Sequence, residues 1–173
     1  AGIDWISIVR GSKPIIAAVN GPAVGIGVTM ILPFDVIVTS EKAKFGFAFI
    51  KMGIVPELAS THFLVSRVGW GRANEMLSGS LYSGKEVHEF GLTEYLVEEG
   101  RLLDKAFEIG TVMSENPDKQ LRMIKQLLTA NAVTTDIKAA EELETKLLQE
   151  CWETEEHEEA VNAFLEKRKP NFR

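Results

Sequence analysis

A continuous apolar run at residues 15–19 leads directly into a glycine-rich segment that extends from Gly21 to Gly27. Such a run is typical of a strand that is covered on both faces. The segment therefore predicts a buried strand, a tight turn and the start of a helix. The first N–H groups of such a helix point outwards at its positive end, where they can hold an anion or a developing oxyanion. The alternative is a strand-to-helix turn that needs small residues only for packing.

The glycine segment does not match two familiar phosphate-binding motifs. Gly21, Gly25 and Gly27 lack the spacing of the dinucleotide-binding pattern G-x-G-x-x-G. No Lys-Ser or Lys-Thr pair follows them, as a phosphate-binding loop requires. The N–H donors predicted at this turn are therefore not expected to bind a nucleotide pyrophosphate through either motif. They suit another kind of ligand oxygen.

Charge and cysteine content narrow the class of protein. The 173 residues carry 19 Lys and Arg and 25 Asp and Glu, a net charge of −6, and general nucleic-acid binding needs a positive face. The single cysteine, Cys151, allows no internal disulfide, which fits a reducing compartment, and we expect a cytoplasmic location. The three histidines lack metal-ligand spacing, and no apolar run has the length of a membrane span. We expect no nucleic acid, membrane or metal as partner.

Strands and helices are predicted to alternate through about residue 100. Besides residues 15–19, strand patterns occur at residues 35–39, 44–47 and 92–97. Helical patterns occur at residues 3–10, 28–32, 57–68, 72–78 and 84–90. Pro33 keeps the helix after the glycine segment short, and Ser83 with Glu86 forms a capping box for the helix at 84–90. This alternation indicates parallel strands joined by crossovers.

The chain changes character after Leu102, where only helical periodicity remains, with a break at Asn116-Pro117. The stretch from Thr135 to Lys169 is strongly acidic and carries one apolar stripe, which predicts a helix that packs this stripe into a groove. We therefore divide the chain into an α/β region at residues 1–115 and an all-helical region at residues 116–173.

Several motifs follow one another in a characteristic order. In chain order they are residues 13–27, Phe34-Asp35-Val36-Ile37-Val38, Glu41-Lys42-Ala43-Lys44-Phe45-Gly46, Met52-Gly53-Ile54-Val55-Pro56, Val68-Gly69, Ser78-Gly79, Gly91-Leu92 and residues 163–172. In this order they resemble the crotonase (enoyl-CoA hydratase/isomerase) family over essentially the whole chain. The resemblance implies an α/β fold, with a partial crotonase-like ββα spiral core over residues 1–115 and a C-terminal all-helical oligomerisation region over residues 116–173.

The resemblance also implies an acyl-CoA site. In the family the glycine turn supplies one of two main-chain donors that hold a thioester carbonyl, and the N–H of Ile26 falls on that donor position. The implied substrate-binding residues are Gly25, Gly27, Thr29, Phe49, Pro56, Phe164 and Lys167. Phe164 and Lys167 are expected at the acyl or nucleotide end of coenzyme A, from a neighbouring subunit, although a lysine at the end of a helix is favourable in any case. For Thr29 the alternative is a hydroxyl satisfied within its helix.

The chain departs from the family at two important positions. Crotonase hydratases use two carboxylates, one to activate water and one to deliver a proton at the α-carbon. Thr29 stands at the first of these positions and Phe49 at the second. Neither side chain ionises usefully, so hydration by a glutamate pair is not expected.

One acid remains nearby, Glu57, which follows Pro56. From the residues alone, a Glu in the first turn of a helix is ordinary charge complementarity. The resemblance implies more, because single-acid enoyl-CoA isomerases of this superfamily place their catalytic carboxylate at this position. One carboxylate can take a proton from C2 and return it to C4, with a thioester enolate between the two steps.

We therefore expect an enzyme that shifts the double bond of an enoyl-CoA thioester, with Glu57 as acid and base. The substrate carries the coenzyme A, and no other cofactor is implied. Two alternatives stay open. In the first, the enzyme adds water to a 2-enoyl-CoA, with Glu57 alone recruiting the water. In the second, the chain is a non-catalytic crotonase-like module that binds partners or RNA.

The resemblance begins partway into the family's catalytic domain, and the loop with the second main-chain donor lies ahead of this point in the family. We therefore expect these 173 residues to be part of a longer polypeptide and to be inactive alone. Loss of one such donor typically costs about 2.7–4 kcal/mol of transition-state stabilisation. The resemblance further implies a homotrimer or a dimer of trimers.

Overall fold

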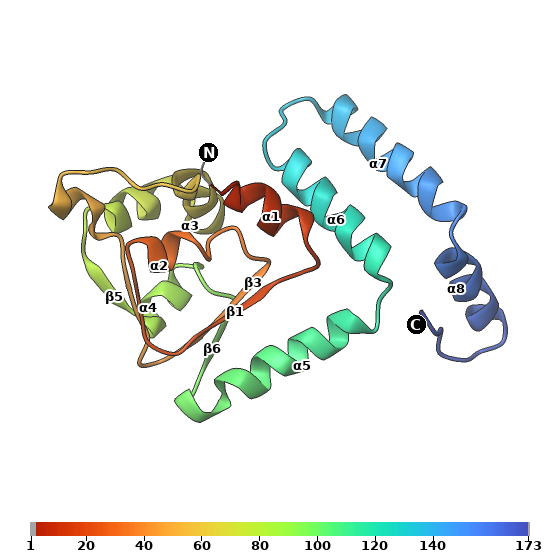
Figure 1. The fold of residues 1–173 in the computed structure, drawn as a ribbon, viewed down its shortest axis with the longest axis horizontal. Coiled ribbons are helices and arrows are strands. Elements are labelled where there is room, and N and C mark those ends of the chain that lie inside the picture. The colour runs from red at the N-terminus through yellow and green to blue at the C-terminus, as the bar shows by residue number, and fades with distance from the viewer. Residues whose placement is uncertain (1–2, 173) are drawn as a thin grey trace. The chain divides into compact units, whose positions relative to one another are not determined.

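The computed structural model describes residues 3–172 (Figure 1). The chain forms two compact units, an α/β unit of residues 3–9 and 15–110 and a helical unit of residues 10–14 and 111–172. Two helices, α1 (Trp5–Gly11) and α5 (Leu102–Ser114), pass from one unit into the other. Between residues 3 and 172, every helix is too short or too polar to serve as a membrane span.

Three parallel strands form the first sheet of the α/β unit, in the order β1-β3-β6. They are β1 (Ile16–Val19), β3 (Val36–Ser40) and β6 (Tyr95–Val97). Ile16 is paired with Val36, and Val38 is paired with Tyr95. The central strand β3 is buried along almost its whole length, as a run of β-branched residues in a covered parallel sheet should be. These strands confirm the ones predicted at 15–19 and 35–39, and the last three residues of the one predicted at 92–97.

The second sheet contains strands that the sequence predicts only in part. It consists of β2 (Pro22–Val24), β4 (Lys44–Gly46) and β5 (Leu81–Ser83). The sequence predicts β4 but neither β2 nor β5, because a strand of three residues is too short to show an alternating pattern. β2 is parallel to β4, whereas β4 is antiparallel to β5. The prediction of parallel pairing is therefore wrong for this last pair.

Of the short helices in the α/β unit, α4 (Gly84–Glu89) begins at its predicted cap, whereas α2 (Ile26–Thr29) begins two residues before the predicted helix at 28–32 and ends three residues before its end. Helix α2 is a single turn, as the proline at position 33 predicts. Helix α4 begins with the predicted capping box. The N–H of Ser83 donates to the Glu86 carboxylate at 2.7 Å, and the N–H of Glu86 donates to the Ser83 hydroxyl at 3.3 Å. This reciprocal pair satisfies two backbone donors at the start of α4.

Helix α3 (Ser60–Leu77) begins later than the sequence predicts. The predicted start at Glu57 is wrong because Leu58 and Ala59 adopt left-handed backbone angles, with φ of 58° and 51°. Gly69 interrupts the helix with φ of 76° and ψ of 168°, so the two predicted helical segments at 57–68 and 72–78 become two helices joined at a kink. Glycine is the residue that adopts such angles without steric cost.

The hydrophobic core cluster of the α/β unit is built around aromatic and aliphatic side chains from the second sheet and the helices. Phe45 of β4 and Phe47 just after it are fully buried, together with Val28 of α2. The other large core residues are Leu32, Phe49, Leu64, Met76, Tyr82, Val87 and Leu92. At Gly84 the chain passes so close to β3 that an added Cβ would lie 2.1 Å from the carbonyl oxygen of Ser40. Only glycine fits at this junction of α4 and β3.

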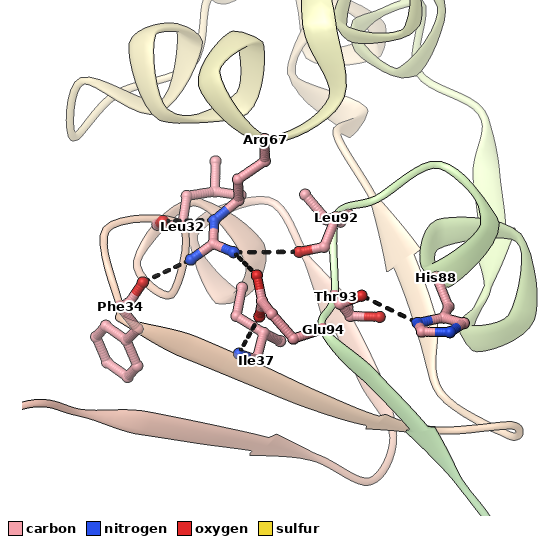
Figure 2. A network of polar contacts seen from close by, with 8 residues as sticks. All are labelled: Leu32, Phe34, Ile37, Arg67, His88, Leu92, Thr93 and Glu94. Carbon is pink, nitrogen blue, oxygen red and sulfur yellow. Dashed lines mark hydrogen bonds and ion pairs between the residues drawn. The ribbon is translucent and has the colours of Figure 1, made fainter. Parts of the chain in front are cut away.

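A polar network ties helix α3 to the ends of two strands (Figure 2). The guanidinium group of Arg67 donates to the carbonyl oxygens of Leu32 at 3.0 Å and Phe34 at 2.5 Å, and forms an ion pair with Glu94 at 2.7 Å. The other oxygen of Glu94 accepts the N–H of Ile37 at 2.6 Å. Arg67 thereby satisfies carbonyl groups in the loop before β3 that no strand or helix hydrogen bond uses.

The helical unit contains α6 (Asp118–Asn131), α7 (Ile137–Trp152) and α8 (Glu155–Leu165). The break predicted at Asn116-Pro117 separates α5 from α6. The prediction of one helix through residues 135–169 is wrong, because the chain stops at Glu153 and starts again at α8. The hydroxyl of Thr154 caps the new helix by accepting the N–H of His157 at 3.2 Å, the role that threonine commonly has at this position.

The segment of residues 10–14 belongs to the helical unit because α6 holds it through polar contacts. Arg10 donates to the hydroxyl of Thr129 at 2.9 Å, and Arg122 donates to the carbonyl oxygen of Gly11 at 2.9 Å. Lys125, which is only 2% exposed, donates to the carbonyl oxygen of Lys13 at 3.1 Å. A buried ammonium group needs such partners to offset its lost hydration.

Candidate active site

The glycine turn joins strand β2 to helix α2. Gly25 adopts φ of 59° and ψ of −125°, and its N–H donates to the carbonyl oxygen of Gly46 on β4 at 2.9 Å. Its own carbonyl oxygen accepts the N–H groups of Val28 at 3.1 Å and Thr29 at 3.2 Å, which closes the first turn of α2. The positive φ explains why glycine is needed at position 25.

The N–H groups of Ile26 and Gly27 are the first two donors of α2. None of the hydrogen bonds formed among residues 3–172 uses either of them. The side chain of Ile26 is 62% exposed, so it projects away from the core. The turn thus presents two main-chain donors at the positive end of a helical turn, which is the chemistry that an oxyanion requires.

Glu57 lies against this same helix. The hydroxyl of Thr29, which is fully buried in α2, donates to Oε1 of Glu57 at 2.6 Å. Glu57 itself is half-buried. The carboxylate is therefore held beside the helix that begins at the glycine turn, although 28 residues separate the two side chains in the sequence. The sequence contains no signal for this contact, since no local spacing relates the two positions.

The backbone directly after Glu57 is strained. Leu58 and Ala59 both lie in the left-handed region, which costs a non-glycine residue roughly 1–2 kcal/mol. The N–H of Ser60 donates to the carbonyl oxygen of Glu57 at 3.1 Å and closes this turn. The hydroxyl of Ser60 is buried and has no hydrogen-bond partner among the described residues. Strained residues of this kind often occur at functional sites.

The aromatic and apolar side chains that precede Glu57 in the sequence separate into buried and exposed groups. Phe49 lies in the 3-10 helix η1 (Ala48–Met52), is 8% exposed and packs in the core. Pro56 is half-buried. The segment around η1 also exposes four large apolar side chains: Ile50, Met52, Ile54 and Val55. These exposed apolar side chains lie in the chain segment that leads to Glu57, and exposed apolar residues suit an apolar ligand.

The other two residues implied by the resemblance, Phe164 and Lys167, lie in the helical unit. Phe164 is on α8 and is 82% exposed, and Lys167 follows the helix with φ of 56°. Their proposed role at the far end of coenzyme A stays a prediction. Across residues 3–172, no group of three or more His, Cys, Asp and Glu side chains is arranged to hold a metal ion.

The fold that carries this site is similar to the folds of solved enoyl-CoA hydratases. The enoyl-CoA hydratase of Bacillus anthracis superposes with a TM-score of 0.89 at 30% identity, over 96% of this chain and 65% of that one. The sequence model of the enoyl-CoA hydratase/isomerase family matches residues 3–173. The chain therefore belongs to the enoyl-CoA hydratase/isomerase family.

Relatives with different activities are similar to this chain to the same degree. It is 35% identical over 163 residues to a probable enoyl-CoA hydratase of Bacillus subtilis, covering 93% of this chain and 63% of that protein. It is also 35% identical over 163 residues to 1,2-epoxyphenylacetyl-CoA isomerase of Escherichia coli, covering 92% and 61%. The chain spans between 54% and 66% of the length of such relatives. Overall similarity therefore does not choose between hydration and isomerisation.

Proposed function

We propose that this chain carries the catalytic carboxylate of an enoyl-CoA isomerase, an enzyme that moves a double bond of an acyl-CoA thioester from C3 to C2. The observation that supports the proposal best is the position of Glu57, whose carboxylate is bonded to α2, the helix with unpaired donors at its start. A base that is bonded to one short helix, and an oxyanion site at the start of that helix, form the pair that enolate chemistry needs.

The reaction follows from this pairing. The thioester oxygen accepts the N–H of Ile26, and the Glu57 carboxylate takes a proton from C2. The electron pair of the broken C–H bond moves towards the thioester oxygen, which gives a dienolate stabilised by the main-chain donor. The protonated Glu57 then returns its proton to C4, and the electrons re-form the thioester carbonyl with a double bond between C2 and C3. The carboxylate is regenerated, and no water is consumed.

The residues at the two hydratase positions favour isomerisation over hydration. Phe49 is buried in the core, and the hydroxyl of Thr29 is bonded to Glu57, so neither residue supplies a second ionised group. Addition of water across a double bond needs one group to activate the water and one to protonate the α-carbon. Isomerisation needs a single group that performs its two proton transfers in turn.

The remaining parts of the proposal concern the substrate and the assembly. We propose that the apolar patch around η1 contacts the acyl chain, and that Phe164 and Lys167 contact coenzyme A from a neighbouring subunit of a homotrimer or a dimer of trimers. The second main-chain donor is proposed to come from a segment that precedes these residues in the natural polypeptide. The substrate supplies the coenzyme A, and no further cofactor takes part in the proposed steps.

The substitution Glu57→Gln tests the proposed role of the carboxylate. In the protein as it is naturally expressed, this change is expected to lower kcat for conversion of a 3-enoyl-CoA into a 2-enoyl-CoA by about 10²–10⁴-fold, because general acid–base catalysis contributes an effect of this size. Ultraviolet absorbance of the conjugated product follows the reaction. The exposed Glu41→Gln is the matched control and is expected to behave like wild type.

The same preparations distinguish the alternatives. Unchanged isomerisation in the Glu57→Gln protein contradicts the proposal. Faster hydration of a 2-enoyl-CoA than isomerisation of a 3-enoyl-CoA by the wild type favours a hydratase in which Glu57 recruits water alone. Absence of both reactions, together with no affinity for a CoA thioester in calorimetry, favours a non-catalytic binding module.

A further inference from the structure

We propose that Thr29 is a positioning residue that holds Oε1 of Glu57, so that Oε2 is the atom that takes and returns the proton. This inference rests on the proposed function of Glu57 and assigns Thr29 a role that involves no contact with the substrate. Thr29 acts only through the carboxylate.

The hydroxyl of Thr29 has one hydrogen to donate and three oxygens within reach. Oε1 of Glu57 lies at 2.6 Å, whereas the carbonyl oxygens of Ile26 and Gly25 lie at 3.3 and 3.4 Å. Both carbonyl groups already accept backbone N–H groups of residues 28–30. A distance of 2.6 Å is typical of a hydroxyl that donates to a carboxylate. The hydrogen therefore belongs to the bond with Glu57.

Thr29 is a rigid support for this bond. Its side chain is fully buried, and its β-branched Cβ restricts rotation about χ1. The main chain of Glu57 is restrained as well, because Leu58 and Ala59 form the left-handed turn that leads into α3 and the N–H of Ser60 closes it. The position of the carboxylate is thus restrained by the backbone of Glu57 and by the hydrogen bond to Oε1.

The second oxygen of the carboxylate is left for chemistry. No hydrogen bond or ion pair among residues 3–172 involves Oε2 of Glu57. In the proposed reaction the C2–H bond breaks, the proton moves to Oε2, and the same proton leaves Oε2 when the C4–H bond forms. If Oε1 were free as well, the carboxyl group would rotate between orientations, and only some of them would face C2 and C4.

A pair of substitutions separates the hydroxyl from the shape of the side chain. Thr29→Val removes the oxygen but keeps a branched side chain of similar size, and we expect kcat for isomerisation to fall about 10- to 100-fold with KM within about twofold, the cost of a misplaced catalytic group. Thr29→Ser keeps the oxygen, and its kcat is expected to stay within about threefold of wild type. Both are assayed in the protein as naturally expressed, with thermal melting as a check on folding.

A double variant shows whether Thr29 acts through Glu57. In a Glu57→Gln background, Thr29→Val is expected to cause no further loss of kcat, because the carboxylate that it positions is already absent. If Thr29→Val does not fold, the pair Thr29→Ser and Thr29→Ala makes the same comparison, since these two side chains differ by one hydroxyl.

The possible outcomes separate this inference from the proposed function. A large loss in Glu57→Gln with wild-type kcat in Thr29→Val overturns the positioning role and leaves the proposed function standing. A raised KM with unchanged kcat in Thr29→Val also overturns it, since that result indicates contact with the substrate. Unchanged activity in Glu57→Gln overturns the proposed function, and with it any role for Thr29 that acts through the carboxylate.

Discussion

At the scale of single residues, the site depends on backbone angles that few residues adopt. Gly25 uses a positive φ at no steric cost, whereas Leu58 and Ala59 adopt the left-handed region with Cβ atoms present. Two such residues in succession next to Glu57 represent a local loss of stability that the rest of the α/β unit must offset. Their position directly after the proposed base is consistent with a turn selected for where it places the carboxylate.

This strain predicts a stabilising substitution. Ala59 is exposed, so Ala59→Gly removes no packing. The free energy gained by relieving the left-handed strain exceeds the free-energy cost of the greater entropy that glycine gives the unfolded chain. We expect the free energy of unfolding to rise by about 0.5–1 kcal/mol, measured by urea denaturation. The control Ala106→Gly, within helix α5, is expected to lower it by about 1 kcal/mol. Equal destabilisation by both changes would show that position 59 is not strained.

At the scale of elements, helix ends are determined by local capping groups. Ser83 and Glu86 start α4, and Thr154 starts α8. The C-terminal tail after α8 is held by hydrogen bonds to a carboxylate instead of by a helix cap. Both oxygens of Glu159 accept hydrogen bonds from Arg168, at 2.6 and 2.9 Å, and the N–H of Asn171 donates to the same carboxylate at 2.7 Å. Together with the end of α5, this tail lines an open pocket of about 650 Å³.

The contact between Glu159 and the C-terminal tail is predicted to depend on pH. The hydrogen bonds from Arg168, then from the backbone of Asn171, lower the pKa of Glu159 from 4.5 to about 2. The pKa of Glu159 is lower in the folded state than in the unfolded state. The contact of its carboxylate with Arg168 and Asn171 is therefore fully present above pH 4.5 and is lost as the pH falls towards 2. Amide chemical shifts of residues 168–172 are expected to report this transition. Glu159→Gln should abolish it, and a transition that persists in this variant would assign it to another group.

At the scale of the whole α/β unit, long-range polar contacts hold elements that no local rule connects. Arg67 of α3 reaches the loop before β3 and the segment before β6 (Figure 2). Its side chain is 13% exposed and that of Glu94 is 38% exposed. Removal of the guanidinium group leaves carbonyl groups without a donor and Glu94 without its ion-pair partner, and buried unsatisfied groups are costly.

Arg67→Ala is therefore expected to lower the free energy of unfolding by about 2–4 kcal/mol in urea denaturation. Arg101→Ala is the matched control, because Arg101 pairs with Asp104 at the surface, where both side chains are mostly exposed. That change should cost less than about 1 kcal/mol. A loss in Arg67→Ala no larger than in the control would show that solvent replaces the network.

Much of this protein is determined by sequence patterns that act over a few residues. The apolar runs predict β1 and β3, Ser83 and Glu86 predict the start of α4, and the glycine segment predicts the turn before α2, whereas the role of Glu57 is implied only by the family resemblance. These signals are readable because their physical causes are local: a burial pattern, a cap, a backbone angle. The same locality explains why β2 and β5 go unpredicted, since three residues carry no pattern of their own.

Only the tertiary structure decides which distant residues meet. The hydroxyl of Thr29 reaches the carboxylate of Glu57, Arg67 reaches the carbonyl oxygen of Phe34, and β4 pairs antiparallel with β5. Each contact joins segments far apart in the chain and depends on how the core places the elements that carry them. No spacing in the sequence encodes such a distance, because the free energy that brings the segments together comes from burial shared across the whole unit.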